Sequence, residues 1–224
     1  MALSIIVPVL DEASLLPEAM QRLMLLVARG VEVIVVDGGS ADGSAELAER
    51  PGVRVIRARR GRAHQMNAGA EIARGDILLF LHADTALPET AVASVCGALA
   101  GGAGVWGRFD VALRNAGPLL RLVARLINLR SRLSGIATGD QAMFVSAQAF
   151  AAAGGFPDQP LMEDIELSKR LLRLSRPACL RERVVTSSRR WETHGVLRTI
   201  LLMWRLRWQY WRGRPAEQLA RDYR

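Results

Sequence analysis

A histidine and an aspartate two positions apart, His82 and Asp84, follow a short apolar run at residues 77–81. Such a run between polar residues is typical of a strand buried on both faces of a parallel sheet. On an extended backbone the two side chains project to the same side, at the strand end where open α/β sheets bind ligands. An imidazole and a carboxylate placed in this way could bind a divalent metal together with an anionic ligand. The alternative is that Asp84 caps the next helix and His82 packs against its neighbours.

Two further polar segments stand at expected element ends. Asp37 precedes a Gly-Gly-Ser turn, where its carboxylate could bind a nucleobase or a ribose, or could satisfy N–H groups of its own turn. Residues 61–69, which include Arg62 and Asn67, are small and polar near a helix start, a suitable place for a phosphate. A redox dinucleotide site is excluded, because residues 8–12 read Pro-Val-Leu-Asp-Glu where that site needs a glycine-rich turn.

Two acidic residues, Glu163 and Asp164, open an expected helix after a glycine-containing turn. Acidic residues in a first turn complement the helix dipole, and this explains a single carboxylate well. It explains the run of Glu163, Asp164 and Glu166 less well. A general base at the edge of a cleft is therefore the sharper hypothesis.

Residues 189–194 read Arg-Arg-Trp-Glu-Thr-His and combine two cations, an aromatic ring and an imidazole. The two arginines could neutralise a diphosphate, and His194 could complete a metal site begun by Asp84. The alternative is a solvated loop that leads into the last helix.

These candidates need a scaffold, and the apolar pattern supplies one. Apolar runs alternate with amphipathic segments, which favours a single α/β domain with a mostly parallel, doubly wound sheet flanked by helices. The expected strands are residues 3–9, 31–36, 53–56, 77–81, 105–113, 141–146 and 184–187. The expected helices are residues 15–27, 44–50, 62–73, 88–99, 118–133, 162–174 and 194–212, followed by a short polar tail.

Composition narrows the class of protein. Half of the 224 residues are hydrophobic, which fits one domain with a sizeable core, and the distant Cys96 and Cys179 indicate neither a disulfide framework nor a zinc site. The net charge of +8 comes almost wholly from arginine; on charge alone, nucleic acid, anionic lipid and phosphorylated substrates stay open. The N-terminus lacks a basic leader and no apolar run reaches about 18 residues, so we expect a cytoplasmic protein.

Taken in order, the motifs resemble those of family 2 glycosyltransferases with the GT-A fold. The ordered set is specific, although each motif is short, and it covers about residues 3–191. Two segments, Leu81-His-Ala-Asp-Thr and Arg189-Arg-Trp-Glu-Thr-His-Gly, further resemble a bacterial subgroup associated with radical-SAM proteins or arsenosugar biosynthesis. The matching segments are Ser4-Ile-Ile-Val-Pro with Glu12, Val35-Val-Asp-Gly-Gly-Ser-Ala-Asp-Gly-Ser, Asn67-Ala-Gly, Leu81-His-Ala-Asp, Gly154-Gly-Phe and Glu163-Asp.

The resemblance implies a role for each matching position. Glu12 and Asp37 would hold the base and ribose of a nucleotide-sugar donor. Asp84 would bind a divalent ion, Mn²⁺ or Mg²⁺, that bridges the donor diphosphate. His194 is a further expected metal ligand from the residue pattern described above, not from the resemblance. Asp164, with Glu163 beside it, would deprotonate the acceptor hydroxyl for inverting attack on the sugar. The expected donor-binding residues are Pro8, Glu12, Asp37, Gly39, Arg62, Asn67, His82, Asp84, Arg190 and Trp191.

Two positions depart from the family pattern. The metal motif is usually Asp-x-Asp, and here its first position is His82, a ligand type that Mn²⁺ accepts. Ser187 stands where processive members have the glutamine of Q-x-x-R-W, although Arg190 and Trp191 match the end of that motif. The chain also lacks the several spanning helices of polymerising synthases, so we expect a non-processive enzyme.

We therefore expect a metal-dependent, inverting glycosyltransferase. It would transfer a sugar from a nucleotide-diphosphate sugar, with UDP as the expected nucleotide, to a hydroxyl acceptor. We expect no nucleic-acid partner. A sugar-phosphate nucleotidyltransferase is the alternative enzyme, but such enzymes carry a glycine-rich Arg/Lys loop where this chain has Asp11 and Glu12. A non-catalytic sugar-nucleotide or membrane-surface binding module is the alternative from another class.

The C-terminal segment, residues 194–224, is expected to extend the domain formed by residues 1–193. Tryptophans and arginines interleave in its helix. This pattern favours binding to an anionic membrane surface, which we expect to be the inner face of the membrane. A lipid-linked acceptor would fit that location. Packing of this helix on the domain, or a homodimer contact, is the alternative.

Overall fold

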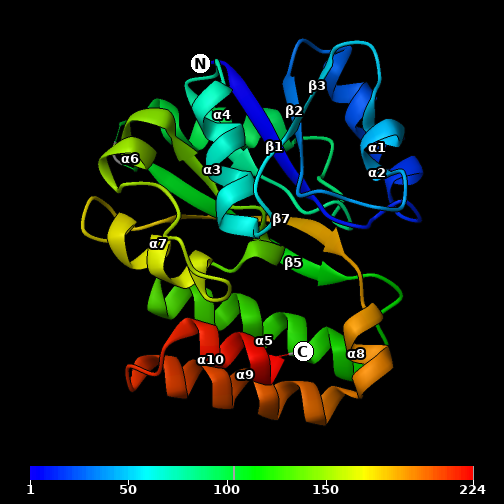
Figure 1. The fold of residues 1–224 in the computed structure, drawn as a ribbon. Coiled ribbons are helices and arrows are strands. Elements are labelled where there is room, and N and C mark those ends of the chain that lie inside the picture. Colours follow the sequence, from blue (N-terminus) through cyan, green and yellow to red (C-terminus); the bar gives the residue numbers. More distant parts are fainter. Residues whose placement is uncertain (103, 224) are drawn as a thin grey trace.

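The computed structural model describes residues 1–102 and 104–223, including all their side chains except those of Arg190 and His194. Its centre is a seven-stranded sheet in the order β3-β2-β1-β4-β6-β5-β7 (Figure 1). The strands are β1 Leu3–Val9, β2 Glu32–Asp37, β3 Val53–Arg57, β4 Ile77–Phe80, β5 Trp106–Leu113, β6 Phe144–Ser146 and β7 Ala178–Thr186. The helices are α1 Leu16–Val27, α2 Ser44–Ala48, α3 Arg62–Ile72, α4 Ala91–Ala100, α5 Pro118–Ser134, α6 Ala147–Ala152, α7 Glu163–Leu171, α8 Arg189–His194, α9 Val196–Trp211 and α10 Ala216–Tyr223, with a 3-10 turn at Gly139–Gln141.

The first four strands form the parallel half of the sheet. β1 pairs in parallel with β2 and β4, and β2 pairs in parallel with β3. Ile5 and Val7 pack in the core that α1 and α4 cover, whereas Ile6 belongs to the core that α3 and α6 cover. The continuous apolar runs thus reflect burial on two faces, and the predicted doubly wound α/β architecture is confirmed.

The other half of the sheet is mixed. β6 runs antiparallel to both β4 and β5, whereas β5 and β7 pair in parallel. The expected strand over 141–146 is shorter than predicted, because residues up to Gln141 form the 3-10 turn and Ala142 has a φ of 45°. β7 is longer than predicted and starts at Ala178 rather than at residue 184.

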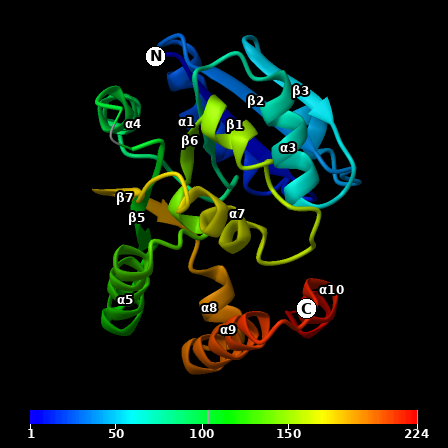
Figure 2. The same ribbon diagram turned by 90° about the vertical axis from the view of Figure 1, so that its left-hand side faces the viewer.

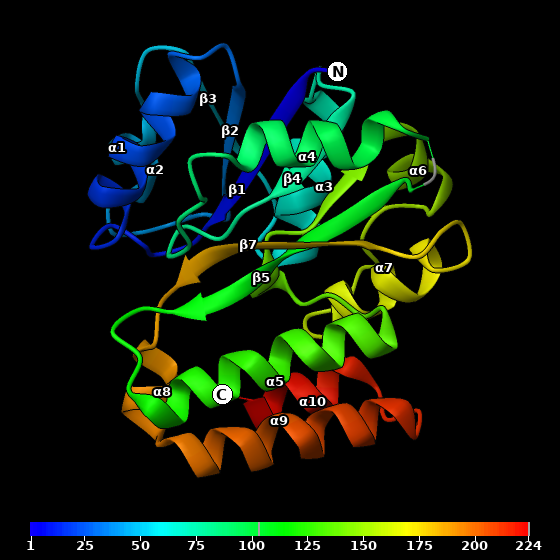
Figure 3. The ribbon, with the colours of Figure 1, turned by 180° about the vertical axis from the view of Figure 1, so that it is seen from behind.

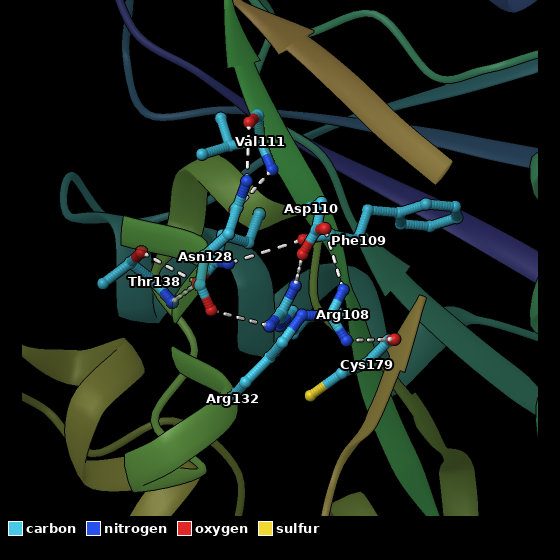
Figure 4. A network of polar contacts seen from close by, with 9 residues as sticks. Arg108, Phe109, Asp110, Val111, Asn128, Arg132, Thr138 and Cys179 are labelled. Carbon is cyan, nitrogen blue, oxygen red and sulfur yellow. Dashed lines mark hydrogen bonds and ion pairs between the residues drawn. The ribbon is translucent and has the colours of Figure 1, made fainter. Parts of the chain in front are cut away.

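A buried polar network joins β5 to α5 (Figure 4). Arg108 is fully buried, forms an ion pair with Asp110 and donates a hydrogen bond of 3.2 Å to the carbonyl oxygen of Asn128. Asp110 also accepts a hydrogen bond of 2.8 Å from Arg132 of α5. The Asn128 side chain bonds to the N–H of Val111 at 2.8 Å and to its carbonyl oxygen at 3.0 Å. These contacts join side chains of one element to groups of the other, and they fix α5 along the sheet.

The C-terminal region differs from the prediction. The expected helix over 194–212 is divided at Gly195, whose φ of 79° and ψ of 144° interrupt the helical path between α8 and α9. Residues beyond 212 are not a polar tail, because residues 216–223 form α10. The predicted boundary between residues 193 and 194 stays a prediction.

One side of the C-terminal helices packs on the domain. Leu206 of α9 and Leu219 of α10 form a small core with Met162 and Ile165 at the start of α7. The predicted alternative of packing on the domain therefore holds for this side of α9. No helix of the described residues is long and apolar enough to cross a membrane.

Candidate active site

The loops that follow β1 and β2 are fastened to each other at the carboxyl edge of the sheet. The N–H of Asp11 donates to Oγ of Ser40 at 3.0 Å, and the N–H of Ala41 donates back to Oδ1 of Asp11 at 2.9 Å. The N–H of Glu12 donates to Oγ of Ser44 at 2.9 Å. Because side chains of one loop satisfy the backbone of the other, Glu12 is held at a fixed place beside the end of β2.

A glutamine of α3 joins this helix to the same two strand ends. Gln65 is 2% exposed, and its Nε2 donates to the carbonyl oxygens of Val9 at 2.7 Å and Val36 at 2.8 Å. These bonds place the first turn of α3, and with it the exposed Arg62, at the carboxyl edge of the sheet.

Arg62 provides a positive charge near several of the candidate residues. Its charge acts on Glu12, His82, Glu163 and Asp164, which come from three different parts of the chain. Because the guanidinium is exposed, it can also meet an anionic ligand that enters from solvent. The residues predicted to bind the donor and those predicted to act as the general base therefore lie around one positive charge.

Glu12 lies near both positively and negatively charged side chains. Burial raises the pKa of Glu12, the charge of Asp84 raises it further, and Arg189 and Arg62 act in the opposite direction. Arg189 thus lies within electrostatic reach of Glu12, although the chain separates them widely. This position agrees with the expectation that Arg189 could neutralise a diphosphate.

His82 and Asp84 lie together as the spacing predicted. Burial lowers the pKa of His82 to about 4, Arg62 lowers it as well, and Asp84 acts in the opposite direction. The imidazole is therefore neutral at pH 7 and can accept a hydrogen bond or a metal. Asp84 accepts hydrogen bonds from Oγ1 of Thr85 at 3.0 Å and of Thr186 at 3.4 Å, which hold its carboxylate at the end of β4.

One carboxylate and one neutral imidazole make a partial donor set for a divalent cation. Within residues 1–102 and 104–223, no group of three or more His, Cys, Asp or Glu side chains could hold a metal by itself. Mg²⁺ in nucleotide sites is usually bound by one or two carboxylates together with substrate phosphates. Asp84 fits such a cation. The side chain of His194, the other expected ligand, lies outside the described part of the structure.

Asp164 is held by two backbone hydrogen bonds at the start of α7. Its Oδ2 accepts from the N–H of Gly139 at 2.9 Å, and its Oδ1 accepts from the N–H of Ile165 at 2.7 Å. Burial raises the pKa of Asp164, these two hydrogen bonds lower it, and the charge of Asp140 raises it. A fixed carboxylate with a raised pKa is suited to accept a proton.

Glu163, the neighbour of Asp164, is buried and only 6% exposed. Burial raises the pKa of Glu163 to about 7; the charge of Asp164 raises it too, and Arg62 acts in the opposite direction. Asp164 is thus held by two backbone donors, whereas Glu163 retains a proton up to neutral pH.

The turn at Gly139–Gln141 is a part of the site that the sequence patterns missed. Gly139 contacts two predicted residues at once: its N–H bonds to Asp164, and a Cβ there would lie 2.7 Å from Cε1 and Nε2 of His82. A capping box between Thr138 and Gln141 closes the turn. The available signal was the polar Thr-Gly-Asp-Gln stretch between an amphipathic helix and a strand.

Asp37, Gly39 and Pro8 lie at the strand ends, as predicted. The buried carboxylate of Asp37 accepts hydrogen bonds from the N–H of Gly39 at 3.0 Å and of Ser40 at 3.1 Å. The local-turn alternative is thus realised. Pro8 lies in β1 opposite Val36 of β2. Contacts of these residues with a donor stay a prediction.

Asn67 has a structural contact that the sequence did not indicate. Its Nδ2 donates to the carbonyl oxygen of Phe156 at 2.8 Å, and its Oδ1 accepts from the N–H of Phe156 at 2.9 Å. Both polar atoms of the amide therefore hold the Gly154-Gly155-Phe156 turn against α3. A donor contact from Asn67 stays a prediction.

Trp191 is half-buried and packs with Leu113, Leu120 and Val196, so it joins α8 to α5. Its expected donor contact stays a prediction. Arg190 belongs to α8 by its backbone, and its side chain lies outside the described part of the structure.

The segment from the start of β1 into β6 contains most of these site residues. Residues 4–145, more than half of the chain, match the model of the family described as glycosyl transferase family 2. The chain belongs to this family. The expected bacterial subgroup within it stays a prediction.

Curated relatives resemble this family 2 member over part of their length. The chain is 33% identical over 156 residues to undecaprenyl-phosphate 4-deoxy-4-formamido-L-arabinose transferase from Pseudomonas aeruginosa, covering 64% of this chain and 46% of the relative. It is 37% identical over 93 residues to the PGL/p-HBAD biosynthesis glycosyltransferase of Mycobacterium tuberculosis, covering 38% of this chain and 36% of the relative. The chain thus spans less than half of these relatives.

Solved structures share the fold of this family 2 member. S. aureus TarS 1–349 in complex with UDP-GlcNAc has a TM-score of 0.64 at 16% identity, covering 84% of this chain and 58% of that chain. The mannosyltransferase PcManGT from Pyrobaculum calidifontis, in complex with GDP-Man and Mn²⁺, has a TM-score of 0.62 at 21% identity, covering 82% and 56%. At these identities the likeness establishes the predicted GT-A-like fold.

Proposed function

We propose that this family 2 member is a metal-dependent, inverting glycosyltransferase. It moves a sugar from a nucleoside-diphosphate sugar, with UDP as the nucleotide, to a hydroxyl acceptor. The observation that carries the proposal is the gathering of Glu12, Asp84, Arg62 and Asp164 at the carboxyl edge of the parallel strands. The gathering provides groups for a base and ribose, a diphosphate and a proton at one place.

On the donor side, Glu12 accepts hydrogen bonds from the nucleoside, and Arg62 and Arg189 neutralise the diphosphate. Asp84 would hold a Mn²⁺ or Mg²⁺ ion, with the neutral ring of His82 beside it. When bound, this ion offsets the negative charge that develops on the leaving diphosphate. The Mn²⁺ in the PcManGT complex supports the inclusion of a metal.

On the acceptor side, Asp164 acts as the general base. As the acceptor oxygen bonds to the anomeric carbon, its proton passes to the Asp164 carboxylate, and the bond from that carbon to the diphosphate breaks on the opposite face. The electron pair leaves with the diphosphate, and the configuration at the carbon is inverted. The hydrogen bonds from Gly139 and Ile165 orient the carboxylate for this transfer.

We also propose a lipid-linked acceptor and a peripheral position at the inner face of the membrane. Two observations support this proposal: the P. aeruginosa relative is named an undecaprenyl-phosphate transferase, and α9 exposes Trp204, Trp208 and Trp211. A homodimer through α9 is the competing arrangement.

The proposal is tested by incubating the purified chain with a panel of UDP-, GDP- and dTDP-sugars, with and without Mn²⁺. We expect Mn²⁺-dependent binding of one UDP-sugar and slow release of UDP by transfer to water. Asp84→Asn is expected to weaken donor binding in Mn²⁺. Asp164→Asn is expected to slow turnover by roughly 10²- to 10⁴-fold while donor affinity is retained. Glu71→Gln, an exposed carboxyl group on the side of α3, is the matched control.

Four outcomes contradict the proposal. If no nucleotide sugar binds, or if Asp84→Asn leaves donor affinity unchanged, the metal–donor site is wrong. Donor binding with no turnover under any condition supports a non-catalytic binding module. Release of pyrophosphate from a nucleoside triphosphate and a sugar phosphate supports a nucleotidyltransferase.

A further inference from the structure

Most of the exposed large apolar side chains of the described residues lie on two helices, α5 and α9. On α5 they recur at steps of three and four residues, so they form one stripe along the helix. Their exposed fractions lie between 48 and 72%, although the opposite side of the helix packs through Leu120 and Val123. The α5 stripe consists of Leu119, Leu122, Leu126, Leu129 and Leu133.

A second stripe follows the same spacing along α9. Its residues are between 57 and 76% exposed, whereas Thr199 and Leu206 on the other side of α9 are buried. The α9 stripe consists of Leu197, Leu201, Trp204, Trp208 and Trp211.

The two helices lie along the same end of the molecule. Both start beside α8 and run in the same direction (Figure 3), and both are seen nearly along their axes in Figure 2. Leu120 and Ala124 of α5 belong to one apolar cluster with Val196 at the start of α9. The two stripes and the arginines beside them are called the α5–α9 surface below.

The charge of this surface has one sign. Arg121 and Arg125 of α5 and Arg198 and Arg205 of α9 are exposed, and the sequences of α5 and α9 contain no aspartate or glutamate. Arg212, just beyond α9, lies over the ring of Trp208 at 5.2 Å from its centroid. Leucine and tryptophan side chains flanked by arginine are the composition of helices that lie in the interface of an anionic bilayer.

We propose that the α5–α9 surface binds an anionic lipid bilayer, with the leucines and tryptophans in the acyl boundary and the arginines at the lipid phosphates. This inference rests on the proposed membrane location, and it adds the exposed stripe of α5 and the anionic lipid chemistry to it. Because both helices start beside α8, which carries Arg189, the docked surface lies next to the donor-binding side of the candidate site.

Charge argues against a second copy of this chain as the occupant. A twofold contact between two α5–α9 surfaces would bring arginines of both copies together, with no carboxylate on either pair of helices to neutralise them. Like charges placed together in an interface are strongly unfavourable. An anionic lipid surface supplies the missing negative charge, and each arginine near it adds to the attraction.

Sedimentation with lipid vesicles tests the proposal on the full chain. We expect binding to phosphatidylcholine vesicles that contain phosphatidylglycerol, weaker binding at high salt, and little binding to phosphatidylcholine alone. Each of Arg121→Gln and Arg205→Gln should weaken binding about fivefold. Each of Leu126→Ser and Trp204→Ser should weaken it about tenfold or more. Leu25→Ser, at an exposed leucine on α1, is the matched control and should leave binding unchanged.

UDP affinity in Mn²⁺ is measured for every variant, because it reports a folded donor site without a membrane. Retained UDP affinity with lost vesicle binding supports the α5–α9 surface. If all variants bind vesicles as the unmodified chain does, or if only the α9 variants lose binding, the surface is wrong as defined. A chain that sediments as a dimer, and that Leu126→Ser or Trp204→Ser turns into a monomer, overturns the proposal in favour of a second copy. Failure of UDP binding in the unmodified chain contradicts the proposed function and leaves the vesicle result to be judged separately.

Discussion

The backbone N–H of Gly139 donates a hydrogen bond of 2.9 Å to Oδ2 of Asp164 across 25 positions of sequence. The same glycine lies against the imidazole of His82, because a Cβ at this position would come within 2.7 Å of the ring. One turn thus sets the position of the proposed base and of a residue beside the proposed metal ligand. The absence of a side chain on Gly139 is what permits the close approach of the His82 ring.

Gly139→Ala tests this relationship. The added methyl group must displace either the His82 ring or the turn that donates to Asp164, so we expect turnover to fall by about 10²-fold, as for a small misplacement of a catalytic group. Steady-state kinetics would show this as a fall in kcat, because the change acts on the base. The control is Gly97→Ala in the middle of α4, where a Cβ meets nothing within 4 Å. That variant should gain about 1 kcal/mol of stability and keep its activity. Equal kcat values for Gly139→Ala and the unmodified chain would contradict the assigned role.

Glu163 should make the stability of the chain depend on pH. Burial raises the pKa of Glu163 from 4.5 to about 7, so between these values the folded chain holds a proton that the unfolded chain releases. The free energy of unfolding must therefore fall as pH rises through this window, by on the order of 3 kcal/mol from this group. Urea unfolding of the chain and of Glu163→Gln at a series of pH values should show a smaller fall for the variant. Parallel pH curves for the two proteins would mean that the carboxyl group is already ionised in the folded state.

Asn67→Ala should act mainly on stability. The substitution removes both hydrogen bonds to the backbone of Phe156 and leaves its N–H and carbonyl oxygen without these partners. We expect a loss of about 1–3 kcal/mol in the free energy of unfolding. Gln21→Ala, at an exposed amide on α1, is the control and should change stability by less than about 0.5 kcal/mol. A large rise in the donor KM at full stability would instead assign Asn67 to donor binding.

Asp110→Ala should be among the most damaging changes outside the site. It leaves the guanidinium of Arg108 buried without its carboxylate and also releases Arg132 (Figure 4). Removing one partner of a buried ion pair costs about 3–5 kcal/mol. Chemical denaturation would measure this, with Glu46→Ala as the control, since the Glu46–Arg57 pair is exposed and is worth less than about 1 kcal/mol. Similar losses for the two variants would show that the network contributes little.

Part of the fold and the site could be predicted because a buried strand has a recognisable local pattern of apolar residues in the sequence. Residues 77–81 are apolar without interruption because β4 is covered on both faces, and His82 and Asp84 follow at its carboxyl end. Their neighbourhood was predicted from spacing alone, and their electrostatic coupling confirms it. The turn at Gly139–Gln141 and the contact of Asn67 with Phe156 could not be predicted, because each depends on a partner from another part of the chain.

The C-terminal helices also combine features that the sequence predicted with features that only the structure shows. The alternation of leucine, tryptophan and arginine in residues 194–212 predicted a helix, but the break at Gly195 arises from a backbone conformation that composition does not reveal. Packing of Leu206 against α7 decides which side of α9 is buried, and this in turn leaves Trp204 and Trp208 exposed.

The sequence by itself thus determined the order of the strands along the chain, the family and the chemical groups at the strand ends, since these follow from local periodicity and short motifs. Only the tertiary structure decided that the charge of Arg62 acts on Glu12, His82 and Asp164 together, because that arrangement requires the strand order and the docking of α3 through Gln65. It likewise decided that the stripes of α5 and α9 stay exposed at one end of the molecule. Local pattern fixes which side of an element is apolar, and long-range packing fixes what that side meets.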